Sequence, residues 1–382
     1  DARAKFDSDT AFANRSRKRV VRMQANEPET IEHWQMLVDR SLLHFNDVYQ
    51  MMGVLLTDDD LAGESKYEAA LPEVVDRLAE AGLLEESEGA KVVYPQGWVN
   101  REGEAQPLII QKADGGYNYA TSDLACILDR IHNVGSRDFL YVVGAEQAQH
   151  FAMVFQVARS AGFMDEAVNA IHVPFGLVMG TDGKKLASRT GGAVQLKDLL
   201  VEAVERADAI IAEKNPSLSD SQRAEVAHML GIGAIKYADL STDRTNNYTF
   251  DWEKMLSFDG NTAPYLQYAH ARICSIFSKE EIERESIRNS NISLEHEREQ
   301  TLARALLAFP EALDSACEIH SPHKLATQLH AIAQAFASFY EACPVLASEG
   351  ITRESRLALC DLTARTLETG LSLLGIEAPQ RM

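Results

Sequence analysis

The sequence predicts an α/β domain with a parallel sheet, followed by an all-helical domain. Apolar runs at residues 117–121, 139–143 and 171–179 alternate with two helical stretches, which is the pattern of a β-α-β-α-β unit. From residue 259 onward the apolar residues keep a helical period, and no strand pattern interrupts them. Ligands of parallel α/β sheets bind at the carboxyl ends of the strands, so we expect a site where the three runs end.

The length and charge of the chain set limits on its organisation and partners. Its 382 residues are too many for one ordinary core, so two or three domains are expected. The formal net charge of -20 disfavours a polyanionic partner, but the charge is uneven. Residues 57–90 hold eleven acidic and two basic side chains, whereas residues 15–22 hold five basic side chains and no acid. That basic cluster can contact phosphate, although a solvated helix face is the commoner use of such a cluster.

Cysteine spacing and hydropathy indicate the compartment. The five cysteines are spread along the chain without a CxxC pair, which indicates reduced thiols and not disulfides or a metal site. No apolar run reaches the roughly 18 residues that a membrane span needs, and no signal peptide is visible. We therefore expect a cytoplasmic protein with no membrane contact and no tightly bound metal. The sequence begins with Asp1 and not with Met, so we also expect it to be a piece of a longer polypeptide.

Before the predicted α/β unit the chain alternates between helical and extended patterns. Residues 1–56 have helical spacing, and residues 71–87 are expected to form one helix that ends near Gly82. Two short strands around a glycine-rich turn are expected in residues 91–112. This region resembles an insertion beside the sheet domain.

After the α/β unit the chain is expected to be helical. One helix is predicted over residues 194–214 and is stopped by Asn215-Pro216, and another begins at Ser219. Gly375 marks the end of the last predicted helix. The four segments expected to form a helical bundle are 263–285, 297–317, 322–342 and 352–374.

The first polar cluster lies at the end of the run 117–121. Asp123 is expected to open a helix, and Tyr119 lies four residues before it. A carboxylate and a phenol in one pocket suit a cationic hydrogen-bond donor such as a guanidinium group. The alternative is that Asp123 only caps the helix.

Two further polar clusters follow the next two runs. Gln147 and His150 are spaced i and i+3 at the start of a helix. A lone histidine is often structural, but the position of His150 at a strand end favours a function.

After the run 171–179, two glycine-containing turns bracket Lys184, Lys185, Ser188 and Arg189. Cations and a hydroxyl on a loop suit a phosphate chain, and the alternative is an exposed basic turn.

The segments GGYNYATSDLA, YVVGAEQAQHF, DGKKLASRTGG, GNTAPYLQYAHAR and GIEAPQRM occur in this order, and they resemble arginyl-tRNA synthetases, a family of class I aminoacyl-tRNA synthetases. The resemblance covers essentially the whole chain. It implies the second half of a Rossmann-type catalytic domain with an insertion, followed by an α-helical anticodon-binding domain. The implied boundaries are residues 1–106 for the end of the first catalytic half and the connective insertion, 107–193 for the second half, 194–258 for a helical stem-contact linker and 259–382 for the anticodon-binding domain.

The resemblance also implies a two-step reaction. Arginine attacks the α-phosphate of ATP, which is used with Mg²⁺ as a substrate, and the arginyl group then passes from the adenylate to tRNA(Arg). The family pattern assigns the arginine substrate to Tyr119, Asp123 and Gln147. The likeness implies a monomer that binds L-arginine, ATP and tRNA(Arg). The tRNA contacts that it implies are Tyr265, Tyr268, Tyr340 and Met382, although tyrosines in a helical bundle also serve packing.

The phosphate-binding loop departs from the family pattern. KLASR at residues 185–189 stands in the place of the KMSKS loop, and its fourth position is Ser188 and not lysine. The candidates for the catalytic cations are therefore Lys184, Lys185 and Arg189, with His150 as a further catalytic candidate. The resemblance also places Gly176, Val178, Lys185 and Ser188 at the ATP site.

A HIGH-type motif, which would contact ATP, does not occur in the sequence. We therefore expect the chain to be inactive alone, as the C-terminal part of an arginine–tRNA ligase. One alternative is a non-catalytic tRNA-binding module of the same family. A nucleotide-dependent enzyme of another type is disfavoured, because no GxGxxG motif follows a strand.

Overall fold

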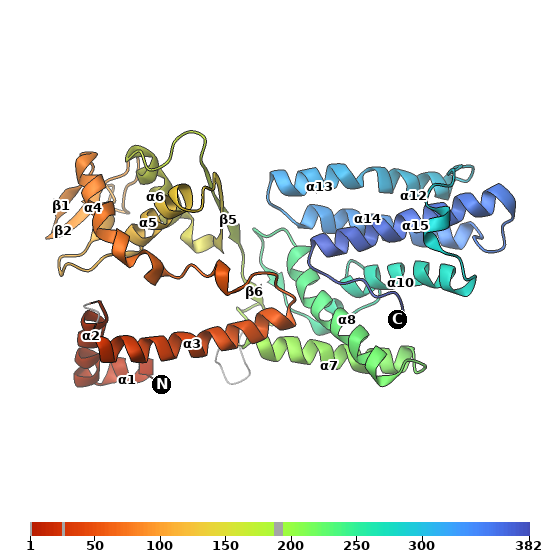
Figure 1. The fold of residues 1–382 in the computed structure, drawn as a ribbon, viewed down its shortest axis with the longest axis horizontal. Coiled ribbons are helices and arrows are strands. Elements are labelled where there is room, and N and C mark those ends of the chain that lie inside the picture. The colour runs from red at the N-terminus through yellow and green to blue at the C-terminus, as the bar shows by residue number, and fades with distance from the viewer. Residues whose placement is uncertain (1, 25–26, 187–193) are drawn as a thin grey trace. The chain divides into compact units, whose positions relative to one another are not determined.

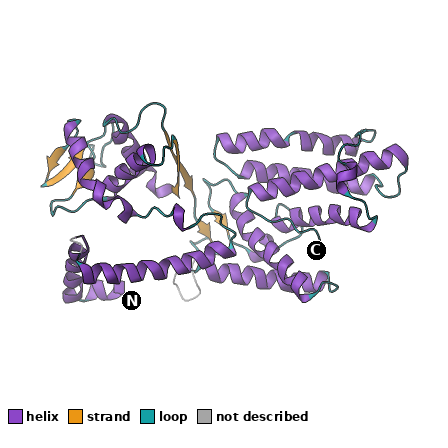
Figure 2. Cartoon of the chain, in the orientation of Figure 1, coloured by secondary structure: helices purple, strands orange, loops and turns teal. Residues whose placement is uncertain are grey.

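The computed structural model describes residues 2–24, 27–186 and 194–382. Figures 1 and 2 show that these residues are mostly helical and that the strands are few and short. The chain divides into two compact units, which are described separately: Asp1–Leu55 with Gln195–Glu202, and Leu56–Val194 with Ala203–Met382. None of the helices in the described ranges is both long and apolar enough to cross a membrane.

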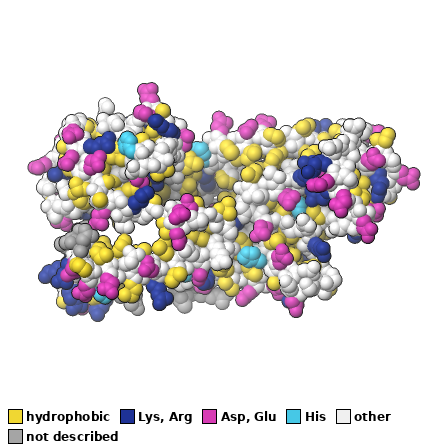
Figure 3. All heavy atoms as spheres, in the orientation of Figure 1, with side chains coloured by type: hydrophobic (Ala, Val, Ile, Leu, Met, Phe, Trp, Pro, Cys, Tyr) yellow, Lys and Arg dark blue, Asp and Glu magenta, His cyan; other side chains and the backbone are white. Residues whose placement is uncertain are grey.

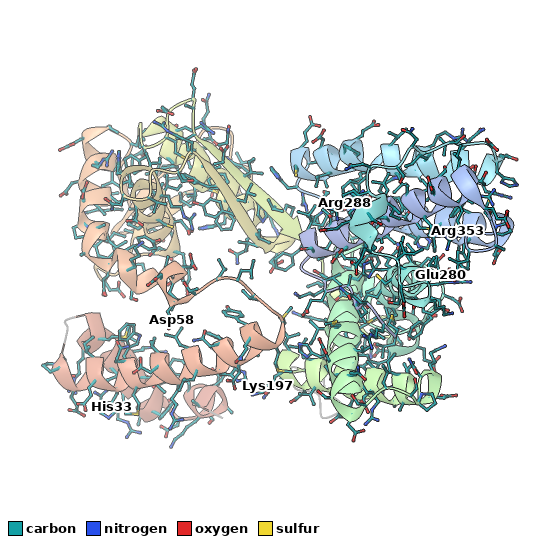
Figure 4. All side chains as sticks on the ribbon, turned by 45° about the vertical axis from the view of Figure 1, so that its right-hand side comes forward. His33, Asp58, Lys197, Glu280, Arg288 and Arg353 are labelled. Atoms are coloured by element: carbon teal, nitrogen blue, oxygen red, sulfur yellow. The ribbon has the colours of Figure 1, made fainter. Side chains whose placement is uncertain are left out.

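The first unit is helical, as the sequence predicts for residues 1–56. Asp9 Oδ1 accepts hydrogen bonds from the amides of Ala11 and Phe12, which satisfies two amides at the start of the second helix. Lys197, which Figure 4 labels, pairs with Asp47 at 2.8 Å. This ion pair ties the last helix of the unit to the third. The helices of the unit are α1 (Ala2–Ser8), α2 (Thr10–Gln24), α3 (Pro28–Met51) and the beginning of α7 (Leu196–Lys214).

The basic cluster at residues 15–22 lies on α2. Dark blue side chains gather over α1 and α2 in Figure 3. Arg19 lies 3.6 Å from Glu29, and Arg22 lies 3.6 Å from Glu27, so two cations of the cluster are partly neutralised by the start of α3. These ion pairs favour the solvated helix face over a phosphate-binding surface.

The second unit begins with a small antiparallel sheet and helices that pack on it. The strand order is β1-β2-β3, and both pairings are antiparallel. The elements are the 3₁₀ turns η1 (Asp58–Asp60) and η2 (Glu64–Ala70), the helix α4 (Leu71–Glu80), and the strands β1 (Glu85–Ser87), β2 (Ala90–Val93) and β3 (Leu108–Gln111). The single helix predicted over residues 71–87 is therefore too long, because residues 85–87 join the sheet.

A parallel β-α-β unit follows. Strand β4 (Asp138–Gly144) pairs in parallel with β5 (Asn169–Phe175), from Asp138 opposite Asn169 to Gly144 opposite Phe175. The helix α6 (Ala148–Ser160) connects them after the 3₁₀ turn η3 (Ala145–Gln147). The alternate β4 residues Phe139 and Tyr141 are buried in one core with α5 (Tyr119–His132) and α6. The parallel pairing predicted for the runs 139–143 and 171–179 is thus confirmed.

The strand predicted at residues 117–121 is wrong. Helix α5 begins at Tyr119 with Asn118 at its N-cap position, so Asp123 does not open the helix but lies in its second turn. Thr121 is fully buried, and its hydroxyl donates a hydrogen bond of 2.5 Å to the Ile110 carbonyl. The amide of Asn118 bonds to the same carbonyl. These two contacts attach the start of α5 directly to the end of β3.

Two long helices lead from the α/β part to the bundle. Helix α7 continues to Lys214, and α8 (Asp220–Leu240) begins after Ser219, whose side chain accepts from the Gln222 amide in a capping box. Both helices agree with the sequence prediction. A Cβ atom at Gly231 of α8 would lie 2.7 Å from the Val204 nitrogen, so a glycine lets α8 pack closely on α7. The short β7 (Tyr248–Thr249) and α9 (Trp252–Met255) follow, and β7 pairs in parallel with β6 (Val178–Met179).

The C-terminal part is a helical bundle with its own core. Its helices are α10 (Ala263–Lys279), α11 (Arg284–Ile287), α12 (Glu297–Leu307), α13 (Phe309–Glu318), α14 (His323–Ala342) and α15 (Gly350–Leu373). Figure 1 shows α12, α13, α14 and α15 packed together, and Leu329, Phe336 and Leu367 are fully buried or nearly so in their shared core. The helix predicted over residues 297–317 is interrupted, because a new helix with Pro310 in its first turn begins at Phe309.

Charged side chains also join bundle helices. Arg353 of α15 donates to Glu280 at 2.9 Å at the surface, and Figure 4 labels both residues. Asp361 is fully buried and accepts bonds of 2.8 Å from Arg284 and from Arg365. Arg365 lies four residues after Asp361 on the same helix, but Arg284 lies 77 positions away, so the buried cluster as a whole was not predicted.

Candidate active site

Asp123 and His150 form a close pair between two helices. His150 Nε2 lies 2.6 Å from Asp123 Oδ2, and each side chain is 28% exposed. The pair joins the second turn of α5 to the first turn of α6. Because the imidazole bonds to Oδ2, Oδ1 of the same carboxylate is left to accept a hydrogen bond from a ligand. This geometry suits a partly buried receptor for a cationic donor group.

Tyr119 and Gln147 lie on the same two helices as this pair. Tyr119 begins α5, is 67% exposed and precedes Asp123 by four residues, so both side chains lie on one helix face. Gln147 ends η3 and is exposed, directly after the carboxyl end of β4. Three of the four residues predicted here therefore surround the start of α6. Tyr119 lies on the same face of α5 as Asp123, and it belongs to this helix and not to the strand that was predicted there.

The two described lysines of the predicted phosphate loop lie on a tight turn after β6. The amide of Gly180 donates to the Lys184 carbonyl at 2.7 Å, and Gly183 has a φ of 73°, which favours glycine. Lys185 bridges to Met179 in antiparallel fashion. Both lysine side chains are exposed. Ser188 and Arg189 lie outside the described residues.

The lysine turn and the Asp123 pair belong to the same sheet edge by topology. Because β4 and β5 are parallel and in register, the segment that holds Gln147 and the segment that leads to Lys185 leave the sheet at the same edge. Among the residues that the structure describes, no hydrogen bond or ion pair joins either lysine to Asp123 or Gln147. The convergence of all three clusters on one ligand therefore stays a prediction.

Gly176 and Val178 lie next to the lysine turn. A Cβ atom at Gly176 would lie 2.4 Å from the Asn246 carbonyl oxygen, so only glycine fits there without movement of the backbone. Val178 accepts a bond from the Leu186 amide at 2.9 Å and pairs with Tyr248 on its other side. Both residues thus shape the backbone that carries Lys184 and Lys185.

The tyrosines predicted to contact tRNA differ in exposure. Tyr268 is 45% exposed and rests edge-on against Phe258, with ring centroids 6.1 Å apart. Tyr265 is half-buried, and burial raises the pKa of its hydroxyl. Tyr340 is half-buried beneath the Arg272 guanidinium, 4.5 Å from its ring centroid. Tyr268 is therefore the most available of the three for stacking on a base.

The C-terminal tail that carries Met382 is held by several elements. Met382 accepts a bond from Asn215 Nδ2 at 2.9 Å through its backbone oxygen. Gln267 donates to the Glu377 carbonyl at 2.7 Å, and His270 Nδ1 donates to the Pro379 carbonyl at 3.0 Å. Gln267 and His270 are fully buried, so the tail is a fixed part of the bundle.

An apolar cavity of about 710 Å³ was not predicted from the sequence. It lies beside Leu140 and Val142 of β4, which point away from α5 and α6, and its other walls come from β5, Gly176, β6, residues 239–248 and the bundle. Arg244 lines this cavity. A single arginine in a loop carries no sequence signal for such a position.

Comparison with known proteins agrees with this architecture. The family model described as tRNA synthetases class I (R), catalytic domain, matches residues 1–252, and the DALR anticodon binding domain matches residues 266–382. The chain belongs to the arginyl-tRNA synthetase family. It is 47% identical to the arginine–tRNA ligase of Cellvibrio japonicus over 100% of this chain and 66% of that protein. It is likewise 48% identical to that of Thermobifida fusca over 100% of this chain and 66% of that protein.

Solved arginyl-tRNA synthetases share the fold. The Plasmodium falciparum structure has a TM-score of 0.85 at 28% identity and covers 98% of this chain and 62% of its own. The Thermus thermophilus structure has a TM-score of 0.80 at 27% identity and covers 97% of this chain and 70% of its own. The chain spans 66% and 64% of the length of the curated relatives from Cellvibrio japonicus and Frankia casuarinae. The predicted family and fold, a parallel α/β catalytic domain followed by a helical anticodon domain, are confirmed.

Proposed function

We propose that this chain is the part of an arginine–tRNA ligase that binds the arginine side chain, carries the lysine turn of the ATP site and recognises tRNA(Arg). The observation that carries this proposal is the Asp123–His150 pair at the edge of the sheet where Gln147 and the lysine turn also emerge. Family membership supplies the reaction. Arginine is activated by ATP, used with Mg²⁺, and pyrophosphate is released before the arginyl group passes to the tRNA.

Each side chain has a role that its surroundings support. Asp123 Oδ1 receives guanidinium N–H groups of the substrate, and His150 holds Oδ2, so we assign His150 a positioning role. Tyr119 adds a phenol one turn before Asp123. Gln147 faces the polar end of the amino acid. Charge complementarity favours arginine over neutral amino acids, because a buried carboxylate without a cationic partner is costly.

The cations that follow β6 are the proposed contacts for the phosphates of ATP. Lys184 and Lys185 are placed to attract the triphosphate and to stabilise the charge that develops on the departing pyrophosphate. We keep Arg189 and Ser188 as further contacts by family likeness. Gly176 and Val178 allow the nucleotide to approach the backbone.

The helical part supplies tRNA recognition. Tyr265, Tyr268 and Tyr340, with Met382, form the proposed anticodon-loop contacts, and unstacked bases of RNA loops suit exposed aromatic rings. The proposed division places the catalytic half in residues 107–193, the stem-contact linker in 194–258 and the anticodon-binding part in 259–382. Residues 1–106 belong to the first catalytic half and the connective insertion.

We further propose that the 382 residues alone do not activate arginine, because the sequence holds no HIGH-type motif. The test is arginine-dependent exchange between ATP and labelled pyrophosphate, with tRNA(Arg) present. We expect exchange from a polypeptide of the relatives' length and none from the 382 residues. If the longer polypeptide binds tRNA(Arg) but shows no exchange, the non-catalytic tRNA-binding module is the better description.

A further inference from the structure

Arg244 makes an unusual set of hydrogen bonds with two parts of the second unit. Its Nη1 donates to the Pro174 carbonyl at 2.9 Å, near the end of β5. Its Nε donates to the His320 carbonyl at 2.8 Å, and its Nη2 donates to the Ile319 carbonyl at 3.3 Å. The guanidinium is planar and rigid, so three carbonyl acceptors fix the distance between β5 and the turn that joins α13 to α14.

The backbone around Arg244 is attached to β6. We call residues 241–250 the strap. The Arg244 carbonyl accepts from the Gly176 amide at 2.8 Å, and Asn247 Oδ1 accepts from the Leu177 amide at 2.7 Å. Further along, the Phe250 amide donates to the Met179 carbonyl at 2.8 Å, and β7 pairs with β6. The strap therefore holds residues 176–179 along their whole length.

Strand β6 in turn holds the lysine turn. The Leu186 amide donates to the Val178 carbonyl at 2.9 Å, and Lys185 bridges to Met179. Residues 178–179 thus lie between the strap on one side and residues 185–186 on the other. A shift of the strap would move both exposed lysines.

The other end of this connection is the turn between α13 and α14. His320 has a φ of 51°, a left-handed conformation that is uncommon for residues other than glycine. The Ser321 amide bonds back to the Ala316 carbonyl at 2.8 Å and closes the turn. The His320 carbonyl accepts from Arg244, and the Ile319 carbonyl accepts from both Arg244 and the Ser321 hydroxyl. Helix α14, which starts after this turn, carries Tyr340.

We propose that Arg244 is a positioning residue that sets the place of the lysine turn relative to the helical bundle, and so controls use of ATP without touching it. Only the kinetic test of this inference rests on the proposed function. Arg244 acts through the Gly176 amide, β6 and the Met179–Lys185 bridge. A purely structural role would lower the stability of the whole unit and affect every substrate alike. A positioning role changes the ATP-dependent step selectively.

The test compares Arg244→Met, which keeps the aliphatic stem but removes the three donors, with Arg244→Lys, which keeps one cation. The matched control is Arg353→Met, because Arg353 bonds only within the described bundle, to Glu280 (Figure 4). Amide hydrogen exchange on the 382-residue chain needs no activity. We expect faster exchange at Gly176, Leu186 and Phe250 in Arg244→Met and rates close to wild type in the control.

Kinetics on a polypeptide of the relatives' length give the second readout. We expect the KM for ATP to rise by about tenfold in Arg244→Met and by less in Arg244→Lys, while the KM for arginine and the dissociation constant for tRNA(Arg) stay within about twofold. Unchanged exchange at residues 176–186, or equal losses for ATP, arginine and tRNA, would overturn the inference. Absence of exchange activity in the wild type would instead overturn the proposed function, and the amide measurements would still decide the role of Arg244.

Discussion

Replacement of Asp123 by asparagine tests the proposed arginine pocket most directly. Asparagine has the shape of aspartate and still offers an oxygen to His150, so the pair at 2.6 Å can persist while the negative charge is lost. Loss of one partner of a buried charge pair costs about 2 to 5 kcal/mol. Because the Asp123 side chain is 28% exposed, we expect the lower part of this range, about 2 to 3 kcal/mol. That corresponds to an increase of about 30- to 150-fold in the KM for arginine.

The assay is arginine-dependent pyrophosphate exchange by a polypeptide of the relatives' length, with tRNA(Arg) and saturating ATP. Asp129→Asn is the matched control, because Asp129 lies on the same helix and pairs with Lys66 at 2.9 Å, away from the proposed pocket. We expect the control to keep its KM for arginine within about twofold. An Asp123→Asn enzyme with wild-type KM for arginine would remove Asp123 from the pocket. A fall in kcat alone would assign it to the chemical step and contradict guanidinium binding.

Three further predictions concern the contact of Gly176 with the strap, the helical part and pH. Gly176→Ala should lower the free energy of unfolding by about 1 to 3 kcal/mol, since its Cβ would meet the backbone of Asn246, whereas Gly63→Ala, with open space around it, should change it little in urea titrations. Tyr268→Ala should weaken tRNA(Arg) binding by about 1 to 3 kcal/mol in filter assays, and an equal loss of arginine affinity would indicate general unfolding. Burial lowers the pKa of His270 below its ordinary 6.5, so the unfolded chain takes up a proton first and the free energy of unfolding should fall as the pH drops below about 6.5. His270→Gln should reduce that pH dependence in the same titrations, and an unchanged slope would contradict it.

The long helices could be predicted because their signals are local. Ser219 caps α8 with its own side chain, and Gly375 follows α15 with a φ of 67°, so each boundary depends on residues close in sequence. The parallel strands β4 and β5 were also recognisable, since most of their residues are apolar. Local propensity and tertiary packing agree in these elements.

The errors lie where a distant contact decides the local structure. The run 117–121 is too short to distinguish a strand from a buried helix start, and the bond from Thr121 to Ile110 decides for the helix. The strand predicted over residues 171–179 is divided into β5 and β6 at Gly176, whose amide turns to the Arg244 carbonyl. Arg244 lies 70 positions from Pro174, so no pattern in either segment shows the contact.

The residues of the candidate site could be predicted from the sequence, but their arrangement in space could not. Asp123 and His150 were each identified from their positions after apolar runs, but their direct pairing across 27 positions was not. That pairing alters the chemistry assigned to His150. An imidazole that bonds to a carboxylate through Nε2 holds that carboxylate in place, which is the positioning role proposed for His150.

The arginine side and the phosphate side of the proposed site are held by different kinds of interaction. Side chains of α5 and α6 hold Asp123, whereas backbone hydrogen bonds from the strap hold the lysine turn. A side-chain pair is lost when one of its two residues changes. A ladder of backbone hydrogen bonds distributes its strength over several bonds, but this ladder also depends on the Arg244 guanidinium that anchors the strap. Sequence change at Asp123 or His150 should therefore affect arginine recognition specifically, whereas the strap can vary in sequence where only its backbone bonds, as long as Arg244, Asn247 and the facing Gly176 are kept.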